Sequence, residues 1–279
     1  MFLLAASAVV LIFSALLSMA GLGAAFLFVP FFYWMGVPLR EAMATALLLN
    51  AISLAFATAV FIQGGLVRFR DARPIVITAV ILSPVGAWSS QYVPRDALLW
   101  LFAGFLVFAG AMMLFYRAAV KPMVGGGGGR EAAVGAGVGG FAGYLGGLLG
   151  VGGGNFVVPA LVWLGLDAKR AAGTTAFVVV FASFTGFLGQ ASVATIDLQL
   201  LAWTAAASII GALIGSWLMH RKLQAAQVKT SIGVLLFFIA ATMLQFYKVS
   251  KTAGALLIPY QLWVSFATAL NVAVWRLNG

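Results

Sequence analysis

A glycine-rich run ending in an asparagine is the part of this chain best suited to bind a small ion. The run reads Gly150-Val151-Gly152-Gly153-Gly154-Asn155 and is followed by Pro159. Four glycines in five residues do not form a stable helix interior, since each costs about 1 kcal/mol relative to alanine. We therefore expect a helix break here, followed by a short helix whose unpaired N–H groups and positive dipole end can bind an anion.

A weaker version of the same pattern lies 129 residues earlier, at Gly21-Leu22-Gly23-Ala24-Ala25 with Pro30. When each residue is set against the one 129 positions later, identical residues align without a gap at Gly21/Gly150, Gly23/Gly152, Pro30/Pro159, Gly36/Gly165, Ala42/Ala171, Thr45/Thr174, Gly86/Gly215, Trp88/Trp217 and Gly104/Gly233. The chain therefore contains one structural unit twice. Two such helix starts facing each other would form an electropositive pocket without a lysine or arginine.

Polar side chains follow each break at matching places. Thr45 and Thr174 coincide under the repeat, and Gln63 and Gln190 end the two apolar spans. Hydroxyl and amide groups beside a break can hold oxyanion oxygens, although membrane threonines also bond to their own helix carbonyls and glycines also allow close helix packing. The candidate substrate-binding residues are Gly21, Gly23, Thr45, Asn50, Gln63, Gly152, Gly153, Gly154, Asn155, Thr174, Thr175 and Gln190. No catalytic residue, metal site or cofactor is expected.

The elements that must position these residues are membrane helices. Apolar residues make up 63% of the 279 positions and charged residues 8%, and the mean hydropathy is +1.10, whereas soluble domains are about 45–50% apolar. Stretches long enough to cross a hydrocarbon core of roughly 30 Å lie at 2–20, 42–62, 74–93, 97–116, 132–149, 171–192, 198–219, 225–247 and 254–276. We predict an all-α polytopic membrane protein.

The basic residues in the loops predict the topology, because cytoplasmic loops carry an excess of lysine and arginine. Segments 2–35 and 132–165 would each be about 51 Å long as one helix, which is too long for one crossing and too short for two. If each is a bent pair that returns to its own side, twelve basic residues face the cytoplasm. The opposite side then carries Arg40, Arg95, Lys248 and Lys251. Corresponding loops change sides, so we predict inverted repeats, each a bent pair plus three transmembrane helices.

This topology divides the chain into four parts. Residues 1–117 form the first repeat, and 132–248 form the second. Residues 118–131, which include a run of five glycines at 125–129, read as a flexible cytoplasmic linker. Residues 249–279 are one extra transmembrane helix, which places the C-terminus in the cytoplasm.

The positions of the ionisable residues narrow the function. All six acids and all basic residues lie at the ends of predicted spans, so no proton relay or fixed counter-ion is expected inside the membrane, and a cation is not the expected cargo. The absence of cysteine excludes disulfides and thiolate sites. The 16 basic residues are spread over short loops and form no face for nucleic acid.

These motifs resemble the TauE/SafE family, also called the toluene-sulfonate uptake permeases. The resemblance rests on residues 150–159 (GVGGGNFVVP), Gly165 and residues 171–175 (AAGTT), with a weaker echo from Gly21 to Thr45, and it covers roughly residues 20–247. It implies a permease of the bacterial inner membrane for sulfite or an organosulfonate. In the family pattern serine often stands where this chain has Thr175.

We therefore predict a secondary transporter that moves a small sulfur-containing anion by alternating access, with its site between the two broken helix pairs near the membrane midplane. An anion channel with the same site is an alternative. A membrane-embedded enzyme would need His, Asp, Glu or Cys at membrane depth or in a catalytic loop, and a non-transporting assembly subunit would leave the glycine break without a purpose. The partners expected are the anion and membrane lipid, and a homodimer is compatible with the sequence.

Overall fold

The computed structural model describes residues 2–94, 96–98, 101, 129–191, 194 and 197–221. Contacts divide the chain into two compact units. The first consists of Met1–Arg95 and Ala118–Leu223, and the second consists of Asp96–Arg117 and Gln224–Gly279. All helices discussed below belong to the first unit. They are α1 (Phe2–Ser18), α2 (Ala25–Trp34), α3 (Leu39–Gln63), α4 (Phe69–Ser89), the short 3-10 helix η1 (Ser90–Tyr92), α6 (Gly129–Leu149), α7 (Gly154–Trp163), α8 (Ala168–Ala191) and α9 (Leu198–Arg221).

The described part of the chain contains helices and no strand, which confirms the all-helical prediction. Five of its helices are long and apolar enough to cross a membrane: α3, α4 with η1, α6, α8 and α9. The predicted spans 225–247 and 254–276, nearly all of the span 97–116 and most of the linker 118–131 lie outside the described residues. The four-part division of the chain stays a prediction.

The helices repeat with the offset found in the sequence. α2 and α7 both begin and end 129 residues apart, and each is 10 residues long. α3 and α8 begin at the same offset, as do α4 and α9. A helix of this short length rises about 15 Å, or half of a hydrocarbon core of roughly 30 Å. Each predicted bent pair is thus a longer helix followed by a half-length one.

Glycine ends the helices of both bent pairs, because the backbone there must adopt a positive φ. Gly21 has φ 67° and Gly150 has φ 71°, and in both cases the next N–H bonds to the carbonyl five residues back. This is the Schellman arrangement, in which a left-handed residue closes the helix. Gly36 (φ 91°) and Gly165 (φ 96°) end α2 and α7 in the same way. Four of the repeated glycines are therefore helix terminators.

Acidic side chains start α8 and α9. The carboxylate of Asp167 accepts a hydrogen bond of 3.0 Å from the N–H of Arg170. The carboxylate of Asp197 accepts bonds of 2.9 and 3.0 Å from the N–H groups of Gln199 and Leu200. A carboxylate at this position satisfies N–H groups that the helix itself cannot pair and complements the positive end of its dipole.

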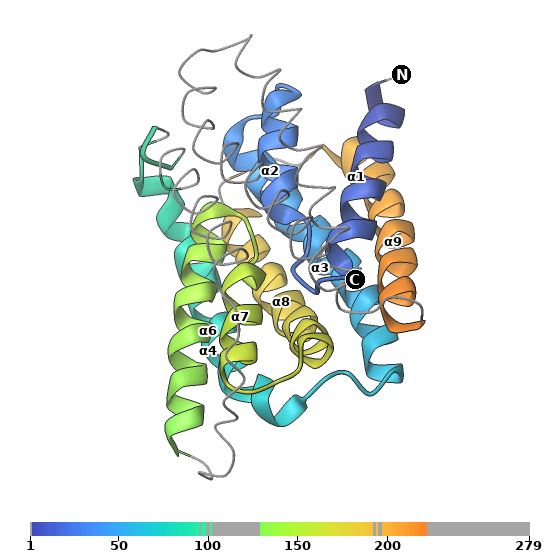
Figure 1. Ribbon diagram of the computed structural model, residues 1–279. Coiled ribbons are helices and arrows are strands. Elements are labelled where there is room, and N and C mark those ends of the chain that lie inside the picture. Colours follow the sequence, from blue (N-terminus) through green and yellow to red (C-terminus); the bar gives the residue numbers. More distant parts are fainter. Residues whose placement is uncertain are drawn as a thin grey trace, which may run out of the picture. The chain divides into compact units, whose positions relative to one another are not determined.

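The two halves exchange helices. Helix α1 packs beside α9, and the repeat-related helix α6 packs beside α4 (Figure 1). A Cβ atom at Gly215 in α9 would collide with the carbonyl oxygen of Ala15 in α1, and one at Gly86 in α4 would collide with that of Tyr144 in α6. Ala15 and Tyr144 are equivalent under the repeat, as are Gly86 and Gly215. The contacts between the halves are therefore reciprocal, with small residues allowing the backbones to approach.

Three contacts gather several loops at one end of the helices. Gly173 near the start of α8 lies against Leu66, which follows α3. The hydroxyl of Thr174 bonds to the N–H of Arg68 just before α4. The end of α9 reaches the same place, since a Cβ at Gly64 would meet the ring of His220. The C-terminal end of α3 and the N-terminal end of α8 therefore lie together. At the other end of α3, Arg40 donates a 3.0 Å hydrogen bond to the carbonyl of Gln91.

Candidate functional site

The two breaks lie against each other inside the described helices. All residues from Gly21 to Val29 are buried, as are those from Gly150 to Val157. A Cβ atom at Gly154, the first residue of α7, would come close to the carbonyl oxygen of Leu22 in the first break. The structure thus brings together the candidate glycines of both halves. A helix break at membrane depth requires such burial in protein or a water-filled cavity, because lipid offers its backbone no hydrogen bonds.

The glycines of the breaks have conformational and packing reasons of their own. Gly23 has φ 73°, and both Gly152 and Gly153 have φ 76°, a region that side-chain-bearing residues adopt only with strain. A Cβ atom at Gly153 would also collide with the carbonyl oxygen of Ala142 in α6. These positions require glycine whether or not a ligand binds beside them.

Asn50, on α3, lies between the two breaks and contacts both. Its side-chain oxygen accepts a hydrogen bond of 3.3 Å from the N–H of Ala25, the first residue of α2. Its side-chain nitrogen donates a bond of 2.9 Å to the hydroxyl of Ser183 on α8. Cβ atoms built at Gly23 and Gly152 would both collide with this amide. Asn50 is fully buried, and it connects the first break to the second half.

The start of α7 differs, because no side chain of the described residues caps it. No described residue accepts a hydrogen bond from the N–H of Gly154. Asn155, in the first turn, is only 5% exposed, and its side-chain oxygen has no hydrogen-bond partner among the described residues. The hydroxyl of Thr175 is also buried without a partner there. Buried polar groups are usually paired, and the same unpaired state is found for the hydroxyls of Ser14 and Thr58, so it is not confined to the breaks.

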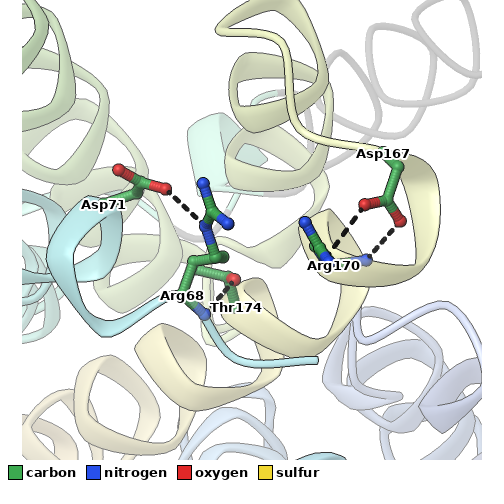
Figure 2. A network of polar contacts seen from close by, with 5 residues as sticks. All are labelled: Arg68, Asp71, Asp167, Arg170 and Thr174. Carbon is green, nitrogen blue, oxygen red and sulfur yellow. Dashed lines mark hydrogen bonds and ion pairs between the residues drawn. The ribbon is translucent and has the colours of Figure 1, made fainter. Parts of the chain in front are cut away.

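Thr174 has a partner within the protein. Its hydroxyl accepts a 3.0 Å hydrogen bond from the N–H of Arg68, the residue before α4. Figure 2 shows this bond beside two ion pairs at the same end of the helices, Arg68 with Asp71 and Arg170 with Asp167. Both pairs are substantially exposed, so each contributes little stability. The hydroxyl of Thr174 connects α8 to the start of α4.

The remaining candidates lie apart from the breaks or have other contacts. Gln190 is fully buried, accepts a hydrogen bond of 3.3 Å from Ser90 and donates one of 3.4 Å to the carbonyl of Gly147. Gln63 is exposed at the end of α3 and does not join the breaks. Thr45 is buried in the second turn of α3. Ser90, the partner of Gln190, lies in the short helix η1 after α4 and is not among the residues predicted from the sequence.

The basic and acidic groups of the described residues lie away from the breaks. Those described here are at or near helix ends, as for Arg40, Asp71, Asp167 and Arg221. Among the same residues no group of three or more His, Asp or Glu side chains is placed to hold a metal ion. The groups gathered at the breaks are therefore neutral: backbone N–H groups, amides and hydroxyls, which can bind an anion without adding a charged side chain to the membrane interior.

The buried breaks, the reciprocal halves and the apolar helices define a multi-pass membrane protein. A family model described as sulfite exporter TauE/SafE matches residues 6–243. Because this match covers most of the chain, the protein belongs to the TauE/SafE sulfite exporter family, which is a transporter family. The resemblance noted in the sequence motifs is thereby confirmed.

Short matches to other proteins also occur. A stretch of 47 residues, 17% of this chain, is 53% identical to 30% of the tryptophan-rich protein TspO of Chlorobaculum tepidum. A stretch of the same length is 43% identical to 30% of the tryptophan-rich sensory protein of Cereibacter sphaeroides, and 39 residues, 14% of this chain, are 51% identical to 23% of the human translocator protein. The chain thus spans less than a third of the length of these relatives. No solved structure matches the chain.

Proposed function

We propose that this protein is a secondary transporter of small sulfur-containing anions, sulfite or an organosulfonate, in the inner membrane of a bacterium. The observation that carries the proposal is the meeting of two buried helix breaks, one of which begins α7 with an uncapped N–H group beside the buried side chain of Asn155. Oxyanions bind well at such helix starts, because N–H groups and the dipole both favour negative charge. The family to which the chain belongs supports the choice of a sulfur oxyanion.

Inverted repeats are part of this proposal. The C-terminal end of α3 lies beside the N-terminal end of α8, and these two helices are equivalent under the repeat, which supports opposite orientations in the membrane. The loops at that end carry Arg68, Arg70, Arg73, Lys169, Arg170 and Arg221. An excess of basic residues marks the cytoplasmic side, so we place this end, and the C-terminus, in the cytoplasm.

Alternating access is part of the same proposal, and this arrangement supports it. In transporters with inverted repeats the substrate lies near the midplane at the interface of the repeats, and rocking of one repeat against the other opens it to either side. The breaks lie at half the length of a spanning helix, and α1 and α6 each pack on the opposite half. Movement of one half would therefore change the surroundings of both breaks.

Flux in proteoliposomes tests the function. The purified full chain should mediate saturable uptake of radiolabelled sulfite, and unlabelled sulfite, taurine or toluene sulfonate should compete if it is a substrate. Counterflow, in which a trapped unlabelled anion drives label inward, is expected of a carrier and not of a channel. Flux of none of these anions above that of protein-free vesicles, together with transport of a cation, would overturn the proposal.

A further inference from the structure

The starts of α2 and α7 are equivalent under the repeat, but among the described residues a side chain accepts a hydrogen bond from the first N–H of α2 and none does so at α7. At α2 the N–H of Ala25 donates to the side-chain oxygen of Asn50. The residue equivalent to Ala25 is Gly154, and the residue equivalent to Asn50 is Val179. Valine carries no acceptor, so the corresponding hydrogen bond cannot form at α7.

Asn50 and Val179 occupy equivalent places against the two breaks. A Cβ at Gly23 would meet the amide of Asn50, and a Cβ at the equivalent Gly152 would lie 3.2 Å from a methyl carbon of Val179. The packing is thus kept while the chemistry changes from an amide to an apolar group. A single sequence position decides whether the helix start beside it has an acceptor.

The orientation of the Asn50 amide is fixed by its partners. Its oxygen must face the N–H of Ala25, because the reverse orientation would place two donors together. Its nitrogen then faces the hydroxyl of Ser183 at 2.9 Å. An anion at the start of α2 would have to displace a fully buried side chain from both bonds. The positive end of α2 is therefore already satisfied.

The start of α7 offers the opposite situation. Within the part of the chain that the structure describes, its first N–H has no acceptor and no side chain caps the helix. Asn155 is 5% exposed and its side-chain oxygen has no partner there. Asn155 lies in the first turn of α7, and rotation of its amide exchanges the unpaired oxygen for the N–H₂ group, which can donate to an anion. The helix dipole, an unpaired N–H and a buried amide whose oxygen has no partner therefore coincide at the start of α7.

We propose that the protein binds a single oxyanion, at the start of α7 beside Asn155, and that the Asn50 amide permanently takes the place of a second anion at the start of α2. This inference rests on the proposed function and adds that the two halves contribute unequally. The first half supplies the Asn50 amide that occupies the start of α2, and the second half supplies the ligand site at the start of α7.

Titration calorimetry on the purified full chain in detergent, with sodium sulfite as the probe, tests the inference. The wild-type protein should bind one sulfite per chain. Val179→Asn introduces at α7 the acceptor that Asn50 provides at α2, and it should weaken sulfite binding about 10- to 100-fold, the usual worth of a hydrogen bond to a charged group. Val179→Leu, of similar size to asparagine and without an amide, is the matched control and should bind close to wild type.

The outcomes separate the two proposals. Two sulfites bound per wild-type chain would overturn the inequality of the halves and leave the proposed function standing, and this measurement needs no variant. If Val179→Asn binds sulfite as tightly as Val179→Leu does, the inequality of the halves is likewise overturned and the proposed function stands. Absence of binding by the wild-type chain, together with absence of flux, would overturn the proposed function and this inference with it.

Discussion

The hydroxyl of Thr174 accepts a 3.0 Å hydrogen bond from the backbone N–H of Arg68. The two residues belong to different halves, since Thr174 lies in α8 and Arg68 immediately precedes α4. The N–H groups at a helix start need acceptors that the helix does not supply, and here the other half supplies one. The repeated threonine is therefore part of the connection between the halves.

Replacement of Thr174 by valine should destabilise the protein. The change keeps the shape of the side chain and removes the acceptor at the start of α4, which typically costs about 0.5–2 kcal/mol. Thermal melting in detergent would measure the loss. Thr185→Val is the control, because the Thr185 hydroxyl bonds only to carbonyls of its own helix. Equal melting of the two variants would contradict the role of Thr174.

Two glycine-to-alanine changes should have opposite effects. Gly153→Ala places a Cβ in a left-handed conformation and against the carbonyl of Ala142, and it should cost about 1–3 kcal/mol from the conformation alone. Gly137→Ala lies within α6, where a Cβ would meet nothing within 4 Å, and it should be neutral or stabilising by up to about 1 kcal/mol. If Gly153→Ala melts at the same temperature as Gly137→Ala, the break does not need glycine.

The two buried asparagines should respond differently to truncation. Asn50→Ala removes two buried hydrogen bonds and leaves the N–H of Ala25 unpaired, so a loss of about 2–4 kcal/mol is expected. Asn155→Ala removes a side-chain oxygen that has no partner among the described residues, so the apo protein should change by less than about 1 kcal/mol. Denaturant or thermal unfolding without sulfite distinguishes them. A larger loss for Asn155→Ala would mean that its amide is structural.

The proposed orientation predicts which ends a membrane-impermeant thiol reagent reaches. The natural chain has no cysteine, so each single replacement reports one position. Cysteine at exposed Arg70 or Asp167 should be labelled from the cytoplasmic side. Cysteine at exposed Tyr92, next to the residue that Arg40 contacts, should be labelled from outside. Labelling of Arg70→Cys and Tyr92→Cys from the same side would contradict the topology.

The repeat and the helix bounds were predictable because they rest on residue types with strong local rules. Glycine at a positive φ and aspartate at a helix start determine where helices end and begin within a few residues. The sequence therefore indicated both breaks and the half-length helices α2 and α7. The packing partners were not predictable, since the exchange of α1 and α6 between halves depends on long-range contacts of small residues.

The roles of the polar candidates were only partly accessible. The sequence identified Asn50, Asn155 and Thr174 as polar residues near the breaks, but their types do not reveal their partners. Asn50 pairs with Ala25 and Ser183, at separations of 25 and 133 residues, and Thr174 pairs with a backbone group 106 residues away. The repeat predicted two helix starts that share one pocket and left open whether both contribute equally. Among the described residues, the start of α2 has an acceptor in Asn50, where the second half has Val179.

The most direct test of the account compares sulfite flux by the wild-type chain and by Asn155→Ala in proteoliposomes containing equal amounts of folded protein. The account predicts saturable uptake of radiolabelled sulfite by the wild-type chain and a loss of most of that uptake in the variant, with the melting temperature of the apo protein nearly unchanged. Equal flux by the two proteins would contradict a site at the start of α7. Absence of flux of any oxyanion by the wild-type chain would contradict transport itself.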